Sequence, residues 1–583
     1  SPWTSNVNDI YYTTGKVGIG LQGVPNAKLH IVPDTTVTGS IASPATEWGS
    51  LLEPYTVNYD GSTSINYCAV EAIATDSDGN VYMTGRYAHE SVAGWTIGNG
   101  ITLPSTGLDL NDFRSFILKY NSSGTIQWAN SIASMSDSRG DGIAVDSSGN
   151  VYATGRYTQQ SGSITLGGSV TLQTTSNGYD TYIVKYNADG APLWANVIGL
   201  SNQYSIYDVR RSKVAVDSGG NVYVTGTHYS SSGITLGVSP AVNLPGGSNY
   251  QSYVVKYDEY GIPLWASSIQ PQNGSDAIFI ATDSSGNVIV TGYYSSNSTV
   301  SILGIDGYAS GYYLPTTTNQ DSYIIKYNTS GTVQWAKSIS GSNNDKGMSI
   351  AVDSSGNVYV TGQYTGSPSF GNGVGFLPQV GGSLTPFIVK YNSNGDAQWA
   401  KGVAHSYSGY GRGIAVDSSG NVYACGYYNS SSISLGNNVT LPSTTNEDSY
   451  IITYDTDGIA QGVTVIEGVR LYEIVVNSNG YLIAGGLVEN LLDATTISLG
   501  NSVSLTRSTT FTSNPSVDWT GFVIKYATQI STTNKALSVE GNAEVGTANL
   551  FVDTTTSRVG VGTATPGYTL DVTGDINFTG ALT

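Results

Sequence analysis

The amino-acid sequence predicts an all-β protein, a seven-bladed β-propeller flanked by short β-rich segments. A phrase built on Asp-x-x-Gly-Asn recurs along most of the chain, the same strand-like runs follow it each time, and no helical periodicity interrupts them. The first residue of the phrase stands at Asp76, Asp146, Asp217, Asp283, Asp353, Asp417 and, in a divergent copy, Asn477. Successive copies are 70, 71, 66, 70, 64 and 60 residues apart, so the repeat has seven units.

Each unit contains two predicted hairpins and an insert. Val358 to Thr361 is β-branched and aromatic, and the Asp-Ser-Ser-Gly-Asn before it supplies an Asx turn and a glycine able to adopt positive φ. A second hairpin joins the strand that begins at Phe387 to the strand that contains Trp399. Between the hairpins lies an apolar pair, such as Ile433 to Gly436 with Val439 to Pro442. Four strands and an insert per unit, repeated seven times, are typical of a propeller.

The two ends of the array predict how the ring closes. The outer strand carries a tryptophan in five units, at Trp128, Trp194, Trp265, Trp335 and Trp399, and Gly462 takes its place in the sixth. The seventh unit runs through Phe522 to Tyr526 and has no such strand after it, whereas Thr46 to Leu52, with Trp48, precedes the first unit. We expect the strand near Trp48 to complete the last blade, because closure removes a long unpaired edge.

The units resemble the bacterial seven-bladed propeller repeats that read Asp-Ser-x-Gly-Asn-Val-Tyr-x-Thr-Gly, then Phe-Ile-x-Lys-Tyr, then a Trp-Ala strand. The resemblance covers Ala45 to Tyr526 and implies a fold, with no activity attached to it. We therefore expect a propeller domain over residues 39–530.

The flanking residues 1–38 and 531–583 are short β segments broken by glycine, too poor in apolar residues to bury a core alone. Arg558 to Val572 contains Val-Gly-Val-Gly-Thr-Ala-Thr-Pro and Leu-Asp-Val, and Thr573 to Gly580 reads Thr-Gly-Asp-Ile-Asn-Phe-Thr-Gly. These phrases resemble shaft modules in the long tail fibres of tailed bacteriophages, especially those of marine cyanobacterial hosts. The resemblance implies an N-terminal and a C-terminal fibre-shaft module in which three chains wind together. The N-terminal copy departs from the pattern at Leu21 to Val24.

Composition excludes several classes of partner. Only 11% of the residues are charged, the net charge is −19, and Gly (72) and Tyr (42) are abundant, so the surface is polar with few charges and suits an extracellular setting. No run of Lys or Arg offers a groove for nucleic acid, and no apolar run reaches the ~18 residues of a membrane span. Cys68 and Cys425 fall in different blades and are expected to be small buried hydrophobes.

The candidate ligand-binding residues lie in the irregular loops between one blade and the next. Such loops surround the central channel on one face, and variable loops on a rigid scaffold commonly carry binding. The aromatic and basic residues in them would suit a sugar, and the alternative is that they are solvated loops. The candidates are Tyr204, Tyr207, Arg210, Arg211, His405, Tyr407, Tyr410 and Arg412. The tyrosine after each Thr-Gly is a second candidate surface, for which packing is the favoured interpretation.

No catalytic constellation is recognisable, and we expect neither an enzyme nor a bound cofactor. The sequence has no Gly-x-Ser-x-Gly elbow, no His-Glu-x-x-His and no phosphate loop. The Asp-x-x-Gly-Asn phrases are interpreted as turns, since most copies lack the carboxylates that a calcium site requires. Calcium stays open only at Asp76 to Gly79 and at Asp455 to Gly458.

The function expected from these features is that of a virion structural protein, a segment of a tail fibre or appendage on the virion surface. It would be a homotrimer through its terminal segments, joined to other fibre proteins, and would display the propeller for attachment to a host-surface glycan or protein or for fibre assembly. Two alternatives stay open. One is a secreted bacterial adhesin or filament subunit, and the other is a polysaccharide depolymerase.

Overall fold

The computed structural model describes most of the repeat array and eight short strands in the terminal segments. The described residues are 10–13, 16–19, 29–31, 46–52, 67–89, 94–106, 113–132, 137–158, 162–173, 179–199, 212–237, 241–305, 307–341, 343–374, 377, 384–403, 408–444, 447–489, 496–498, 504–506, 519–527, 543–545, 550–553, 558–561, 570–572 and 577–578. Within these ranges the chain forms strands and turns and no helix. It divides into two compact units, residues 41–529 and residues 1–40 with 530–583.

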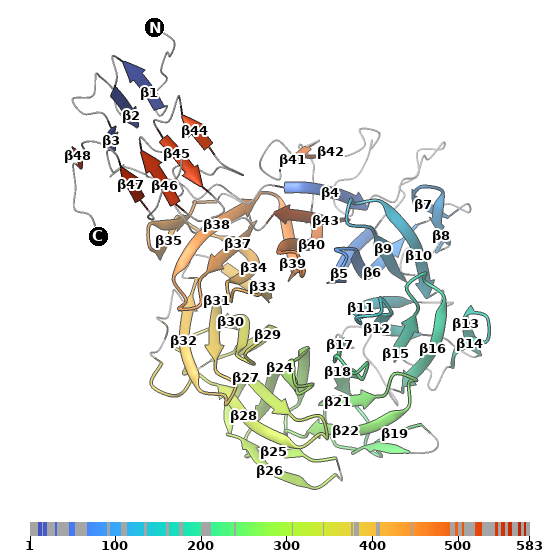
Figure 1. Ribbon diagram of the computed structural model, residues 1–583. Coiled ribbons are helices and arrows are strands. Elements are labelled where there is room, and N and C mark those ends of the chain that lie inside the picture. The colour runs from blue at the N-terminus through green and yellow to red at the C-terminus, as the bar shows by residue number, and fades with distance from the viewer. Residues whose placement is uncertain are drawn as a thin grey trace. The chain divides into compact units, whose positions relative to one another are not determined.

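The unit at residues 41–529 is a ring of seven four-stranded antiparallel blades around a central channel (Figure 1), which confirms the predicted propeller. The innermost strands are β5 (Tyr67–Thr75), β11 (Ser138–Val145), β17 (Lys213–Val216), β23 (Ser275–Thr282), β29 (Asp345–Val352), β33 (Ser408–Val416) and β39 (Val469–Val476). The second strands are β6 (Val81–Ala88), β12 (Val151–Thr158), β18 (Val222–His228), β24 (Val288–Ser296), β30 (Val358–Tyr364), β34 (Val422–Asn429) and β40 (Tyr481–Glu489).

The outer half of each blade continues the same order. The third strands are β9 (Arg114–Tyr120), β15 (Tyr179–Tyr186), β21 (Gln251–Tyr257), β27 (Thr317–Tyr327), β31 (Thr385–Tyr391), β37 (Asp448–Tyr454) and β43 (Trp519–Ala527). The outermost strands are β10 (Ile126–Ile132), β16 (Pro192–Ile198), β22 (Pro263–Ile269), β28 (Val333–Ile339), β32 (Ala397–Gly402), β38 (Ala460–Ile466) and β4 (Thr46–Leu52).

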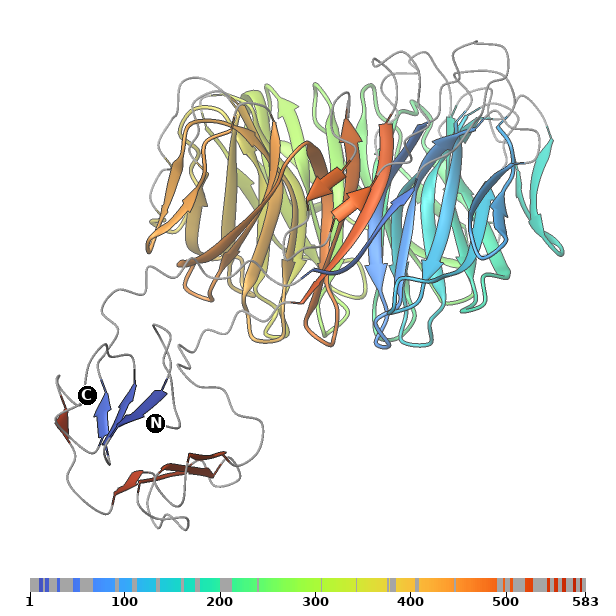
Figure 2. The same cartoon turned by 90° about the horizontal axis from the view of Figure 1, so that it is seen from above.

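The strands run from one face of the ring to the other (Figure 2). The tight turns between first and second strands lie on one face, here called the turn face. The connections from one blade to the next lie on the opposite face, here called the loop face. In the turn after β29, the Asp353 carboxylate accepts hydrogen bonds from the backbone N of Ser355 and Asn357 (both 2.9 Å), from Asn357 Nδ2 (2.8 Å) and from Tyr359 Oη (3.0 Å). Gly356, at φ 78°, supplies the left-handed residue that the turn requires.

The apolar inserts form the predicted hairpins in six of the seven units, whereas the described residues between β30 and β31 of the fifth unit contain no such hairpin. In the second unit, Ile164 and Leu172 of the hairpin are buried in the same cluster as Tyr157 and Tyr182. The hairpins are β7 (Trp95–Gly98) with β8 (Ile101–Leu103), β13 (Ser163–Gly167) with β14 (Val170–Gln173), β19 (Ile234–Leu236) with β20 (Val242–Leu244), β25 (Val300–Leu303) with β26 (Ala309–Leu314), β35 (Ile433–Gly436) with β36 (Val439–Leu441), and β41 (Thr496–Ser498) with β42 (Ser504–Thr506).

The tyrosine after Thr-Gly packs in the core, which confirms the favoured interpretation. Its side chain is fully buried in five of the six copies, at Tyr87, Tyr157, Tyr294, Tyr364 and Tyr428. Tyr229 is the exception and is exposed, because His228 occupies the equivalent place in the strand register and is buried instead.

Among the described residues, an outer tryptophan holds six of the seven seams between blades, and in five of these a lysine of the neighbouring strand donates to the same carbonyl oxygen. Trp399 Nε1 and Lys390 Nζ both donate to the carbonyl oxygen of Thr456 in the next blade, at 3.0 and 3.1 Å. The same pair of contacts recurs where the ring closes. Trp48 Nε1 and Lys525 Nζ donate to Ser122 O at 3.0 and 3.2 Å.

The closing strand is therefore a full member of the last blade. β4 pairs antiparallel with β43, from Thr46 opposite Tyr526 to Leu52 opposite Gly521. The chain thus enters the ring and leaves it on neighbouring strands, at the turn face.

The way the ring closes also explains why glycine replaces tryptophan in the sixth unit. Gly462 lies opposite Thr453, which stands where the other blades have lysine. In the other seams the tryptophan side chain contacts the turn between the third and fourth strands of the next blade, but in the last blade those strands, β43 and β4, are not consecutive in the chain.

The second unit, residues 1–40 with 530–583, contains two small sheets. One has the order β1 (Ile10–Thr13), β2 (Lys16–Ile19), β3 (Leu29–Ile31), β48 (Asn577–Phe578), and the other has β44 (Ala543–Val545), β45 (Leu550–Asp553), β46 (Arg558–Val561), β47 (Leu570–Val572). β3 and β48 pair in parallel, so residues from both ends of the chain share one sheet. The propeller is accordingly an insertion within this smaller unit.

Candidate functional site

The predicted site residues are described only in part. Tyr204, Tyr207, Arg210, Arg211, His405 and Tyr407 lie outside the described residues. The remaining two, Tyr410 and Arg412, lie on β33, the innermost strand of the sixth blade. The structure brings them together, since the guanidinium carbon of Arg412 lies 5.5 Å from the centre of the Tyr410 ring.

A β-bulge places Arg412. The pairing of β33 with β34 shifts between Gly411 and Gly413, which leaves Arg412 as the extra residue. A bulge re-aims its side chain relative to a regular strand. The flanking position must be glycine because the backbones of neighbouring blades approach closely there. A Cβ on Gly411 would lie 2.5 Å from the carbonyl oxygen of Gly362.

Arg412 is surrounded by aromatic rings. We call Tyr410, Arg412, Tyr427, Arg470 and Tyr472 the Arg412 cluster. The Arg412 guanidinium lies 5.3 Å from the Tyr427 ring centre and 5.6 Å from that of Tyr472, distances typical of cation–π contacts. Its Nη2 donates to Tyr427 Oη at 2.7 Å, and the rings of Tyr410 and Tyr427 are 4.7 Å apart at an angle of 32°. The tyrosine rings of the cluster therefore hold the Arg412 guanidinium in place.

The two arginines of this cluster differ in whether a carboxylate forms an ion pair with them. Arg470 Nη2 and Nε donate to Glu447 Oε2 at 2.6 and 3.0 Å, so its charge is matched by a carboxylate. Arg412 makes no ion pair with any of the described residues, and its nearest polar partner is the Tyr427 hydroxyl. The positive charge of Arg412 is therefore not neutralised within the described protein.

A second cluster lies on the first two blades. We call Tyr67, Glu71, Arg86, Phe113 and Arg139 the Arg86 cluster. Arg86 Nη2 donates to Tyr67 Oη at 2.5 Å and lies 3.9 Å from Glu71, and its guanidinium is 5.0 Å from the Tyr67 ring centre. The guanidinium of Arg139 lies 5.2 Å from the Phe113 ring centre. Burial raises the pKa of Tyr67 to about 12, so its hydroxyl stays protonated.

The two clusters are linked through a shared apolar group. Tyr472 of the Arg412 cluster and Phe113 of the Arg86 cluster both pack against an apolar group that includes Tyr67 and Leu487. Tyr67 begins β5 and lies opposite Trp519, the first residue of β43, so this surface is at the loop face. We call the combined surface the Arg/aromatic arc. It extends over the sixth, seventh, first and second blades at the mouth of the channel.

Sequence reasoning missed most of the arc because its candidates were residues of the loops and the tyrosine after each Thr-Gly. Tyr427, Arg470, Tyr472 and Arg86 lie on the first and second strands of their blades. A variable position of the repeat could have indicated two of these residues. It lies between the recurring glycine and tyrosine of the second strand, and it is Arg86 in the first blade and Tyr427 in the sixth.

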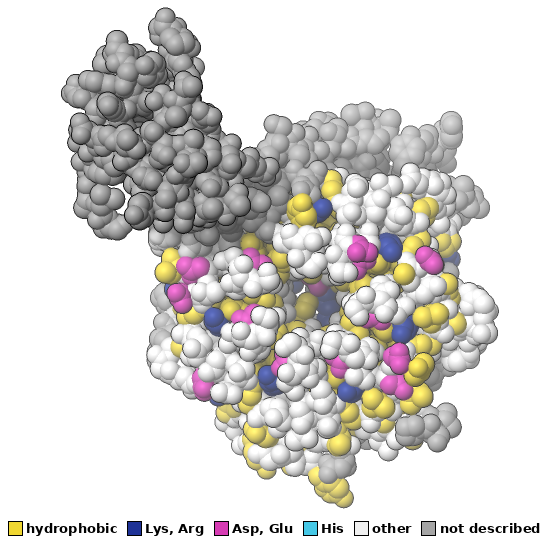
Figure 3. Space-filling model, viewed as in Figure 1, with side chains coloured by type: hydrophobic (Ala, Val, Ile, Leu, Met, Phe, Trp, Pro, Cys, Tyr) yellow, Lys and Arg dark blue, Asp and Glu magenta, His cyan; other side chains and the backbone are white. Residues whose placement is uncertain are grey.

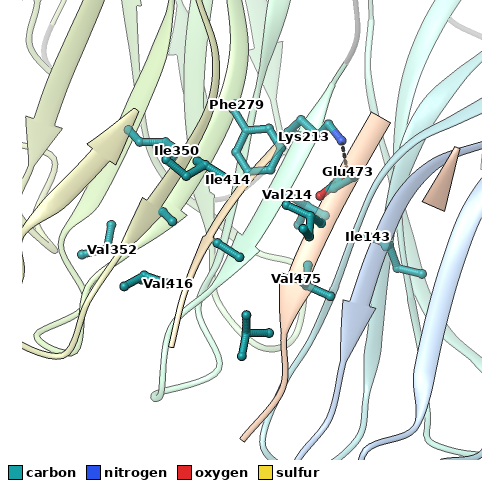
Figure 4. Close-up of a pocket in the computed structure, with 14 residues that line it drawn as sticks. Ile143, Lys213, Val214, Phe279, Ile350, Val352, Ile414, Val416, Glu473 and Val475 are labelled. Carbon is teal, nitrogen blue, oxygen red and sulfur yellow. Dashed lines mark hydrogen bonds and ion pairs between the residues drawn. The ribbon is translucent and has the colours of Figure 1, made fainter. Parts of the chain in front are cut away.

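Deeper in the channel, an ion pair spans its width. Lys213 Nζ on β17 of the third blade donates to Glu473 Oε2 on β39 of the seventh at 2.7 Å, and both side chains are buried. Lys213 Nζ also lies 5.0 Å from the Phe279 ring centre. Figure 4 shows the pair above an apolar belt of isoleucine and valine side chains, in a cavity of about 250 Å³. The ion pair therefore constricts the channel between its two mouths.

Charges on the outer surface are sparse, as the composition predicts. Figure 3 shows one face of the ring, where basic and acidic side chains are spaced singly around the central opening and most of the surface is uncharged. Within the described residues no three His, Cys, Asp or Glu side chains come close enough to hold a metal ion. The Asp76 carboxylate accepts hydrogen bonds from Asp78, Asn80 and Tyr82 within its own hairpin, as expected of turn chemistry. Cys68 and Cys425 are both free and buried.

Two buried carboxyl groups lie in the fourth and fifth blades, away from the arc. Burial, reinforced by the negative charge of Asp321, raises the pKa of Asp345 to about 8, and burial raises the pKa of Asp321 to about 6. Both side chains are enclosed, so neither is presented to a substrate. In the second and fourth blades the position of Asp345 is occupied by Ser138 and Ser275.

We expect Asp345→Ser to remove a pH dependence of stability. Between an unfolded pKa of 3.8 and the folded pKa of about 8, the folded state retains a proton that the unfolded state has released, so stability falls as pH rises through this window. The substitution should raise the free energy of unfolding by at least about 2 kcal/mol at high pH and by much less near pH 5. Urea unfolding at about pH 5 and pH 8.5 measures this. An equal effect at both pH values would contradict it.

Comparisons with known proteins agree with the propeller fold. A repeat family described as "Beta-propeller repeat" matches residues 334–366. The uncharacterized WD repeat-containing protein L264 of Acanthamoeba polyphaga mimivirus is 25% identical over 424 residues, which cover 61% of this chain and 30% of that protein. Thus the chain spans less than a third of the length of the curated relative it matches. The chain is a β-propeller repeat protein.

Two of the solved structures that the chain matches have low sequence identity and low TM-scores. The polysaccharide lyase Uly1 is 9% identical with a TM-score of 0.37, covering 83% of this chain and 100% of that one. YCF48 bound to the D1 peptide is 9% identical with a TM-score of 0.32, covering 84% and 99%. In the described residues no helix is long and apolar enough to span a membrane.

Proposed function

We propose that this chain is a segment of a virion tail fibre or appendage that displays its propeller to bind a glycan on the host surface. The observation that carries the binding part is the Arg/aromatic arc. Arginine and tyrosine side chains at the mouth of a rigid ring offer flat apolar faces for sugar rings and directed donors for their oxygens. The arc acts by binding, without turnover of the glycan.

The topology of the ring supports display. The chain enters and leaves the propeller on neighbouring strands, β4 and β43, at the turn face, and Thr46 lies opposite Tyr526. The arc lies at the loop face, where β5 begins. The binding surface is thus on the face opposite the chain connections, an arrangement that suits a domain carried on a stalk.

The virion setting rests on the terminal phrases and their resemblance to tail-fibre shafts. The match to a mimivirus protein is in keeping with a viral origin. In this proposal the terminal segments trimerise, join other fibre proteins and place the propeller outside the cell. Light scattering of the intact chain should give three times its mass of 61.0 kDa, and a monomer would contradict the trimeric shaft.

A glycan array with the full chain tests the binding part. The wild-type protein should bind a subset of surface glycans, and Tyr410→Ala combined with Tyr472→Ala should lose at least tenfold in affinity, because the sugar loses its aromatic platform. Tyr308→Ala combined with Tyr313→Ala is the matched control. These tyrosines are 76% and 54% exposed on another surface, and their removal should leave binding unchanged. Binding that is lost in the control and retained in the arc variant would contradict the proposal.

A further inference from the structure

Arg412 has donors that the protein leaves unused. Its Nη2 donates to Tyr427 Oη at 2.7 Å, whereas Nε is enclosed without a hydrogen-bond partner. Nη1 has no partner among the described residues and is not enclosed, so it reaches solvent. A guanidinium held in place with an open edge is a preorganised anion site, since little side-chain entropy is lost when a ligand binds.

Neighbouring cations are already matched by acidic side chains. Arg470 pairs with Glu447 at 2.6 Å, Arg139 pairs with Asp137 at 3.0 Å, and Lys213 pairs with Glu473 at 2.7 Å. The aromatic rings around Arg412 hold its position without neutralising it. Since no described carboxylate forms an ion pair with Arg412, an anionic ligand can supply one.

The shape and charge of the site favour a carboxylate. A planar carboxylate accepts two parallel hydrogen bonds from a guanidinium. A densely charged polyanion is disfavoured because the chain carries a net charge of −19 and Glu447 lies beside the cluster. The partly exposed rings of Tyr410 and Tyr472 flank the guanidinium and offer apolar faces to a sugar ring.

We propose that Arg412 is the anion-binding residue of a subsite for an acidic sugar, a uronic or sialic acid residue within a surface glycan. The carboxylate accepts hydrogen bonds from the open edge of the guanidinium, and the sugar ring packs on the neighbouring tyrosines. This inference rests on the proposed glycan-binding function and adds the chemical class of the ligand.

Calorimetric titration of the full chain with defined oligosaccharides tests it. The acidic probes are a disaccharide with a single glucuronic acid residue and sialyllactose, and the matched neutral probes are the carboxyl-reduced disaccharide and lactose. We expect the acidic member of one pair to bind at least tenfold more tightly than its neutral counterpart. Arg412→Gln should abolish that difference and leave thermal unfolding unchanged, and Arg412→Lys should restore only part of it, because an ammonium lacks the planar fork. Tyr313→Ala, the control, should change neither the preference for the acidic probe nor thermal unfolding.

The outcomes distinguish failure of the acidic-sugar assignment from failure of the proposed glycan binding. If neutral and acidic sugars bind equally, or if Arg412→Gln leaves the preference intact, the acidic-sugar assignment is wrong although glycan binding by the arc stands. Tighter binding of a sulfated galactan oligosaccharide than of either acidic probe would likewise overturn the carboxylate assignment. If no sugar on the array or in the titration binds, the proposed function itself fails.

Discussion

Lys213→Met should lower the free energy of unfolding by about 3–5 kcal/mol, because it leaves Glu473 buried without its counter-ion. The carboxylate of Glu473 is 2.7 Å from Lys213 Nζ, and the two residues belong to blades that are not neighbours in the ring. The ion pair thus ties opposite sides of the channel together. Chemical denaturation of the wild-type and variant chains measures the difference.

The double variant Lys213→Met with Glu473→Leu is the matched control. It removes both charges and fills the space with apolar side chains, so it should recover most of the stability lost in the single variant. A single variant as stable as the wild type would contradict the assignment of a buried, structurally required ion pair. So would a double variant no more stable than Lys213→Met.

Trp48→Ala should destabilise the ring by about 3 kcal/mol, and deletion of residues 46–52 should do so by considerably more. Trp48 Nε1 donates to Ser122 O at 3.0 Å, and its ring packs in the cluster that contains Tyr120 and Ile126. β4 continues along the chain into β5 of the first blade, and its pairing with β43 closes the ring by hydrogen bonds alone. Its deletion also exposes the edge of β43, which should promote aggregation.

Trp399→Ala provides the comparison for this prediction. Trp399 makes the equivalent hydrogen bond to Thr456 O at 3.0 Å, in a seam between covalently consecutive blades. Both variants should lose similar stability, whereas only the strand deletion should abolish the single cooperative transition. Thermal unfolding followed by near-ultraviolet circular dichroism measures both properties. If the deletion variant unfolds as the wild type does, β4 does not close the ring.

The architecture was predictable from the sequence because its determinants are local and repeated. The turn at Asp353 to Asn357 specifies a hairpin in every unit, so the number and order of the blades follow from spacing. The strand near Trp48 was predictable as the closing strand because the last unit lacks its own outer strand. The sequence shows Gly462 as an irregularity, but the reason for it comes from the structure, since β43 and β4 of the last blade are not consecutive in the chain and no turn joins them.

The candidate site was predictable only in part. Tyr410 and Arg412 were found because they lie near an irregular loop, whereas Tyr427 and Arg470 belong to regular strands. Contacts between distant residues leave no mark in a single sequence. Lys213 and Glu473 are 260 residues apart, and their pairing depends on the diameter of the channel and on the bulges of the inner strands.

The central claim is that a host-surface glycan binds at the Arg/aromatic arc on the loop face. Hydrogen–deuterium exchange of the full chain, with and without a glycan identified on the array, tests it most directly. The account predicts slower exchange at the loop-face ends of β33, β34 and β39, and no change in the Asp-x-x-Gly-Asn turns. Protection confined to the turn face, or spread evenly over the seven blades, would contradict it.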